Sequence, residues 1–163
     1  MAKIERKYLA HFINTAAPGE EQAVYERLGK DLEEFSPELA AQVDSKKNIL
    51  GETSVVISSY TKTASVEPYY AEQGSALFNR LQTIIDDQLL LDDLKTDVIE
   101  VKLWEAEGEG TTFPAIKEEA MIEVSSYGGD TTGYQIPFTL HFTGVRTKGT
   151  FDTSTKTFTA AKQ

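Results

Sequence analysis

The residues of this chain that are able to do chemistry are few and scattered. There are two histidines, His11 and His141, and no cysteine, so the chain has no thiol nucleophile, no disulfide and no thiolate metal ligand. Neither histidine stands in a zinc, Ser-His-Asp or dinucleotide-binding motif. His11 falls inside an expected strand without a partner motif, and we interpret it as structural. The residue types therefore argue against an enzyme, and we expect no catalytic residue and no cofactor.

Two pairs of aspartates, Asp86-Asp87 and Asp92-Asp93, raise the question of a divalent cation. Calcium loops alternate oxygen ligands around a bending glycine, and these pairs lack that pattern. We interpret them as a solvated acidic edge and expect no metal site. The Gly-rich segment 105–112 has no lysine and therefore does not match a phosphate-binding loop. Its acidic residues, which would repel phosphate, are Glu105, Glu107 and Glu109.

Charge is distributed unevenly along the chain. The net charge is −10, and residues 86–130 hold thirteen acidic residues against three lysines, whereas residues 131–163 hold one acid and four bases. Nucleic-acid binding requires clustered lysine and arginine, and no such cluster occurs. The acidic middle is explained either by solubility alone or by a surface that keeps polyanions away.

The elements that must position these residues are mostly strands. A length of 163 residues predicts one domain, 1–163, with a core of its own. Neither a signal peptide nor an apolar run of membrane-spanning length is recognisable, so we expect a soluble cytosolic chain. Strands are expected at 8–13, 54–59, 97–104, 121–127 and 134–143, and a final hairpin should pair 150–151 with 157–158.

One stretch has a clear helical stripe. Leu77, Leu81, Ile84 and Leu89 follow the spacing of a single buried face, and Ser75 is a suitable N-cap. The sequence therefore predicts a helix over about 75–89, packed on a β-framework. The predicted fold class is mainly β with one α-helix.

Residues 21–34 are ambiguous. Val24, Leu28, Leu32 and Phe35 are spaced as on a helix, but Gly29 interrupts them and a proline follows at position 37. By itself the pattern favours a weak helix. Residues 40–48 are polar and expected to be exposed, as in an arm or a functional loop.

The order of several short motifs resembles a known family. These motifs are Leu28-Gly29-Lys30, the run Lys47 to Thr53, the run Ser65 to Tyr70, and the stretch from Tyr127-Gly128-Gly129 through the alternating strand to Gly149-Thr150-Phe151-Asp152. Together they resemble the major tail proteins, or tail tube proteins, of long-tailed bacteriophages, in particular those of Gram-positive hosts. The resemblance covers nearly the whole chain and rests on order and spacing.

That resemblance implies a β-sandwich or barrel with one helix, and about 30–53 as an extended arm reaching a neighbouring subunit in place of the weak helix. The apolar residues from Val24 to Phe35 would then make contacts across an interface. It also implies a virion structural protein, made in the bacterial cytoplasm, whose hexameric rings stack into a tube through which DNA passes without sequence-specific binding. Its partners would be further copies of itself, tape-measure and tail completion proteins, and no membrane.

Two sets of residues follow as hypotheses. The contacts between subunits are expected at Lys47, Asn48, Ile49, Leu50, Glu52 and Thr53. The lumen is expected to be lined by the wet face of the sheet, at Glu123, Ser125, Thr139, His141 and Thr143, because polar residues there alternate with an apolar face.

Two other functions are compatible with the sequence. One is the tube subunit of a contractile injection device, such as a phage-tail-like bacteriocin or a type VI secretion tube, which shares the fold. The other, from a different class, is a monomeric β-sandwich module that binds sugar or protein.

Overall fold

A computed structural model describes residues 1–105 and 110–162, so Glu107 and Glu109 of the acidic loop lie outside the described residues. The described chain contains one α-helix and eleven strands. The helical elements are η1 (Arg6–Tyr8), α1 (Ala76–Asp87) and η2 (Leu91–Leu94). The strands are β1 (Leu9–Asn14), β2 (Tyr25–Arg27), β3 (Ala41–Lys47), β4 (Thr53–Tyr60), β5 (Thr63–Val66), β6 (Lys95–Lys102), β7 (Thr112–Val124), β8 (Gly128–Asp130), β9 (Gly133–Gln135), β10 (Phe138–Asp152) and β11 (Thr157–Ala160).

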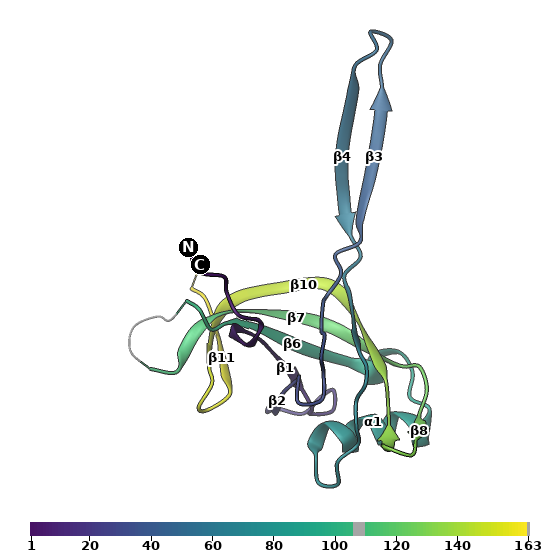
Figure 1. The fold of residues 1–163 in the computed structure, drawn as a ribbon, viewed down its shortest axis with the longest axis vertical. Coiled ribbons are helices and arrows are strands. Elements are labelled where there is room, and N and C mark those ends of the chain that lie inside the picture. Colours follow the sequence, from purple (N-terminus) through teal and green to yellow (C-terminus); the bar gives the residue numbers. More distant parts are fainter. Residues whose placement is uncertain (106–109, 163) are drawn as a thin grey trace.

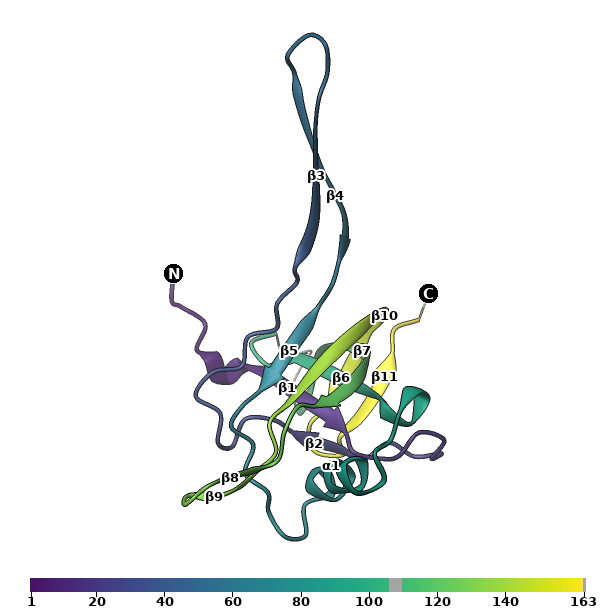
Figure 2. The same cartoon turned by 90° about the vertical axis from the view of Figure 1, so that its right-hand side faces the viewer.

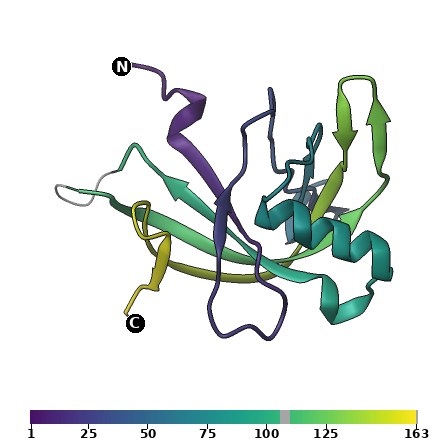
Figure 3. The same cartoon turned by 90° about the horizontal axis from the view of Figure 1, so that it is seen from below.

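The body is a curled antiparallel sheet that forms a half-barrel. Its strand order is β11-β10-β7-β6-β1-β2, and β5 pairs with the first part of β10. Figure 1 shows the long strands β6, β7 and β10 curving together, and Figure 3 shows the same curvature from below, with α1 against the sheet. The prediction of a mainly β fold with one helix is confirmed.

The two longest strands extend beyond their predicted bounds. β7 begins at Thr112, well before the predicted start at position 121, and β10 continues from Phe138 to Asp152. The pairing of β10 with β7 shifts register between Phe142 and Arg146, where Gly144 has a φ of 94°. A bulge of this kind bends a strand without ending it. The break in alternation after position 143 therefore marks a bend inside one strand.

One hydrophobic core lies between α1 and the sheet. Leu77, Leu81 and Ile84 of the helix pack with apolar residues of the strands, among them Ile122 and Leu140. The N-cap prediction is confirmed, because the Ser75 side chain accepts a hydrogen bond from the Phe78 amide. The helix ends where Gln88 adopts a left-handed conformation, with a φ of 47°.

A second core closes the other end of the half-barrel. It joins Phe12, Tyr25, Ile99 and Phe151, and the ring centroids of Phe12 and Phe151 are 4.6 Å apart. The predicted final hairpin is confirmed, because Phe151 of β10 pairs with Phe158 of β11.

A long two-stranded hairpin, β3 and β4, leaves the body and is called the arm, 41–60, from here on. Figures 1 and 2 show it projecting far beyond the sheet in both views. The arm thus differs from its expected range of 30–53, and it includes residues 54–59, which the sequence favoured as a strand of the body. Three consecutive apolar residues, Val55 to Ile57, are typical of a buried strand, which is why that segment was assigned to the sheet.

The segment before the arm belongs to the body. Within residues 21–34 the structure has the short strand β2 and no α-helix. Leu28, Leu32 and Phe35 pack against the first core, so the expectation that they make contacts across a subunit interface is wrong. Their spacing reflects an irregular segment that covers the sheet of its own chain.

Candidate functional site

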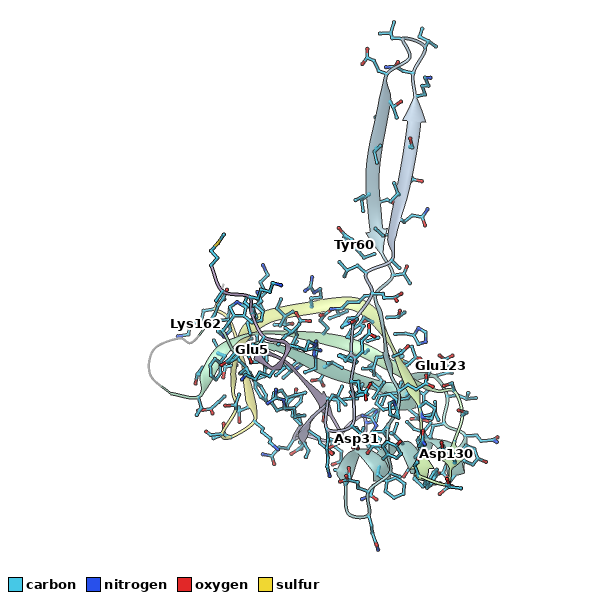
Figure 4. All side chains as sticks on the ribbon, in the orientation of Figure 1. Glu5, Asp31, Tyr60, Glu123, Asp130 and Lys162 are labelled. Atoms are coloured by element: carbon cyan, nitrogen blue, oxygen red, sulfur yellow. The ribbon has the colours of Figure 1, made fainter. Side chains whose placement is uncertain are left out.

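The arm exposes an apolar surface that the described part of the body does not cover. Val43 faces Ile57 across the hairpin, and Val55 lies two residues further along the same face. All residues of both strands are exposed, including Val43 at 53% and Val55 at 63%. The side chains in Figure 4 project into open space on both sides of the hairpin.

The tip of the arm holds all six residues that were predicted to contact another subunit. The Asn48 side-chain oxygen accepts hydrogen bonds from the Leu50 and Glu52 amides at 2.9 and 3.0 Å. Gly51 has a φ of 83°, in the left-handed region that favours glycine. This turn directs Ile49 and Leu50 outward, with exposed fractions of 102% and 77%. The tip is therefore a turn stabilised by its own hydrogen bonds, and it presents two aliphatic side chains to solvent.

Charged side chains gather where the arm joins the body, and sequence reasoning missed this cluster, called the root network. Glu118 of β7 is buried, and its carboxylate lies 2.6 Å from the Lys62 Nζ and 3.4 Å from the Arg146 Nε. Glu100 of β6 lies 3.3 Å from the His11 Nε2 and 3.9 Å from the Lys62 Nζ. Lys62 lies two residues after the end of the arm, so the network holds the place where the chain returns to the sheet.

The electrostatics of the root network favour the ionised form of Glu100. The hydrogen bond to His11 lowers the pKa of Glu100, and the charges of Lys62 and Arg146 lower it further against the opposing effect of burial. The Lys62 Nζ also lies 4.8 Å from the centroid of the Phe142 ring. No local sequence motif indicates this cluster. Its five members come from four strands and one connection, and only the fold brings them together.

The other side of the arm's base is also held by the body. The Glu38 and Thr63 backbones exchange two hydrogen bonds, at 2.7 and 3.0 Å. Phe35, a few residues earlier, packs edge-on against the His11 ring with centroids 4.8 Å apart, and its carbonyl accepts a hydrogen bond from Arg6 at 2.9 Å. Both strands of the arm therefore start from fixed positions.

The five residues predicted to line a lumen lie together on one face of β7 and β10. Thr139 pairs with Glu123, and the His141 Nε2 lies 3.0 Å from the Glu123 carboxylate. The Ser125 hydroxyl donates to the Pro137 carbonyl at 3.3 Å. Thr143 donates to the Glu119 carboxylate at 3.0 Å, which adds a residue that the sequence reasoning missed. This polar face comprises Glu119, Glu123, Ser125, Thr139, His141 and Thr143.

The polar face is acidic and accessible. Four of the five predicted residues are exposed, and Thr139 is half-buried. Since two carboxylates stand among hydroxyl groups, the face can form hydrogen bonds with water and repel phosphate. Glu119 would have been found by counting the alternation of β7 back from Glu123, had the strand been predicted at full length.

Across 1–105 and 110–162, no group of three or more His, Asp or Glu side chains could hold a metal ion. In the same residues, no helix is long and apolar enough to cross a membrane. Comparison with protein-family models and with curated proteins found no match.

Proposed function

We propose that this chain is the structural subunit of a phage tail tube, in which hexameric rings stack into a channel for DNA. The observation that carries the proposal is the arm, which is an extended hairpin with an apolar face and a hydrogen-bonded turn at its tip, held at its base by hydrogen bonds and ion pairs. The resemblance of motif order to tail tube proteins supports the same function. In this proposal the chain resides in the virion tail, after synthesis in the bacterial cytoplasm, beside tape-measure and tail completion proteins.

The physical reason is that the arm is an unfavourable structure for a monomer. An isolated two-stranded hairpin is only marginally stable in water, and apolar patches on soluble monomers mark interaction surfaces. The arm carries Asp44 and Glu52 against Lys46 and Lys47, so it has no net charge within a chain of −10. A neutral arm with an apolar face on an acidic body is suited to binding protein. A second copy of the chain is the partner that is present wherever the protein is made.

The half-barrel supports assembly as well. The sheet ends at β2 on one side and at β5 and β11 on the other, so its edges do not meet. Open edges are templates for pairing with another chain. Identical subunits joined through different surfaces form rings or filaments, as a stacked tube requires.

The polar face supports a role in DNA passage. In the proposal it lines the lumen, where the carboxylates of Glu119 and Glu123 repel the phosphates of DNA along the whole channel. His141 lies against Glu123, so its ring is held by an acid and is not presented alone to the nucleic acid. A surface of this kind prevents adhesion during transit.

Negative-stain microscopy of the concentrated full-length chain tests the proposal. We expect rings or tubes. The matched variant replaces residues 41–60 by Gly-Gly, which is feasible because the Thr61 amide already donates to the Ala40 carbonyl at 3.3 Å. This armless variant should remain folded and monomeric.

Two results would count against the proposal. A monodisperse species of 18.1 kDa at every concentration would favour the monomeric binding module. Tubes of normal length from the armless variant would exclude the arm as the assembly element. A tube that forms only inside a purified sheath would instead favour the contractile injection device.

A further inference from the structure

A surface groove lies beside the C-terminal end of α1. It has a volume of about 540 Å³ and is lined mainly by aliphatic side chains of α1, η2 and the end of β7. Leu90 and Tyr127 at its rim are exposed, by 71% and 64%. A groove with this lining is suited to aliphatic side chains from another segment.

The groove contains an open strand edge. The pairing of β6 with β7 starts at Lys95 opposite Met121, so within the described residues the part of β7 after Met121 has no β6 residue beside it. The groove is lined there by residues 121–127, and three residues of the polar face, Glu123, Ser125 and His141, stand at its border. A segment seated in the groove would cover that edge of the polar face, and Glu119, Thr139 and Thr143 would remain outside the contact. An exposed edge next to apolar pockets is the arrangement that receives an extended segment from another chain.

The charge around the groove is negative. Residues 84–95 contain four aspartates, Asp86, Asp87, Asp92 and Asp93, against one lysine, Lys95, which lies 3.9 Å from Asp92. The acid Glu123 lines the groove itself. The last turn of α1 carries no basic residue, so the negative end of the helix dipole is not compensated from within the helix. A positively charged segment placed here would be favoured.

The arm tip has the complementary chemistry. Residues 46–52 hold Lys46 and Lys47 against Glu52, and the aliphatic pair Ile49 and Leu50 stands between them. It is a turn at the end of an extended hairpin, with two apolar side chains at its apex and two cations beside them. The apolar pair matches the aliphatic lining of the groove, and the cations match its negative charge.

The tip cannot reach the groove of its own molecule. In Figures 1 and 2, α1 lies on the far side of the body from the tip. Seven paired residues at about 3.4 Å each give the hairpin a reach of roughly 24 Å away from the body. A tip seated in such a groove therefore belongs to another copy, and the contact joins two different surfaces.

We infer that the groove between α1, η2 and the end of β7 receives the arm tip of a second copy of this chain. Ile49 and Leu50 enter the apolar part, and Lys46 and Lys47 lie against Asp86 and Asp87. The inference rests on the proposed function in taking the arm as the assembly element, and it adds the surface that the arm binds.

Cross-linking tests the contact directly, because the chain has no native cysteine. Ile49→Cys and Leu90→Cys are made as separate variants, mixed and oxidised. We expect a disulfide-linked species of twice 18.1 kDa, at least tenfold more abundant than with the control partner Val145→Cys, whose site on β10 is exposed and outside the groove. Equal yields from the groove and the control would overturn the inference.

Charge exchange gives an independent readout. Lys46→Glu with Lys47→Glu should reduce the cross-link at least tenfold, and Asp86→Lys with Asp87→Lys in the partner should restore it. The matched control is Glu20→Lys with Glu21→Lys, an exposed acidic pair in the connection between β1 and β2. Restoration by the control to the same extent would contradict a specific contact.

The outcomes of these experiments distinguish the docking surface from the proposed function as a tube subunit. Tubes that form without the Ile49 to Leu90 cross-link would overturn the docking surface and leave the proposed function standing. A specific cross-link in a protein that forms neither rings nor tubes would support the docking surface and count against the tube.

Discussion

At the level of single residues, the most informative side chains are the charges at the arm's root. Glu118 is buried, and it is neutralised by Lys62 directly and by Arg146 at a longer distance. Taking two charges out of water is costly, and a buried pair therefore stabilises a protein less than it orients its parts. We interpret the pair as fixing where the arm leaves the sheet.

Removing one partner of this ion pair should lower the free energy of unfolding more than removing both partners. Lys62→Met leaves the Glu118 carboxylate buried with Arg146 alone, and the free energy of unfolding should fall by about 3 kcal/mol. The double variant Lys62→Met with Glu118→Met removes both buried charges and should recover more than half of that loss, because Arg146 is half exposed and can be solvated. Urea unfolding of the three proteins measures the difference. A double variant less stable than Lys62→Met would show that the pair is favourable in itself.

Glu100 makes stability depend on pH in the acid range. Its pKa lies below the ordinary value of 4.5, chiefly because His11 donates a hydrogen bond to it. A carboxylate whose pKa is lower in the folded state contributes stability above its unfolded pKa, and this contribution is lost as the pH falls through the folded pKa. Urea unfolding between pH 6 and pH 2 should therefore show a smaller loss for Glu100→Gln than for the parent chain. Parallel pH profiles would contradict the role of Glu100.

At the level of elements, α1 is held at its start by another strand. The Ser75 hydroxyl and the Leu77 amide both donate to the Glu26 carboxylate of β2, at 3.1 Å each. An acid at a helix N-terminus is favourable, because it accepts from free amides and opposes the helix dipole. The contact also ties the short strand β2 to the helix across the first core.

Ser75→Ala should lower the free energy of unfolding by about 1 kcal/mol, the usual cost of a lost N-cap. Asn79→Ala is the matched control on the exposed side of α1 and should change stability by less than half as much. Thermal or urea unfolding followed by circular dichroism measures both. An equal effect of the two substitutions would mean that the cap contributes nothing beyond helix propensity.

Sequence patterns predicted the elements whose structure depends on residues that are close together in the chain. The stripe from Leu77 to Ile84 and the cap at Ser75 were predicted correctly, since helix spacing and capping involve neighbours in sequence. The predicted end at about 89 was too late, because the helix ends at Asp87 and Leu89 lies beyond it. The arm was misplaced because Val55 to Ile57 are apolar, and periodicity reports that a side chain is apolar without saying what covers it. The root network was invisible for the same reason, since Lys62 and Glu118 meet only through the pairing of distant strands.

At the level of the whole molecule, one face of the sheet is buried and apolar near α1, and the opposite face is polar. Near α1 one face is core, with Ile122 and Leu140 buried, and the opposite face carries Glu123, His141 and Thr143. The wet face was predicted correctly as a set because alternation along a strand fixes which residues share a face. The direction in which that face points in an assembly depends on contacts outside one chain.

The accessibility of position 143 in assembled tubes tests whether the polar face lines a lumen. Thr143→Cys introduces one thiol at an exposed site that is not part of the groove near α1. In assembled tubes we expect a small maleimide to react readily and a bulky polymer-linked maleimide to react at least tenfold more slowly, because a narrow channel excludes the polymer. The control is the same variant kept monomeric by replacing residues 41–60 with Gly-Gly, in which both reagents should react at similar rates. Rapid reaction of the bulky reagent with intact tubes would place the polar face on the outside, and the repulsion of DNA by Glu119 and Glu123 would then have no role in transit.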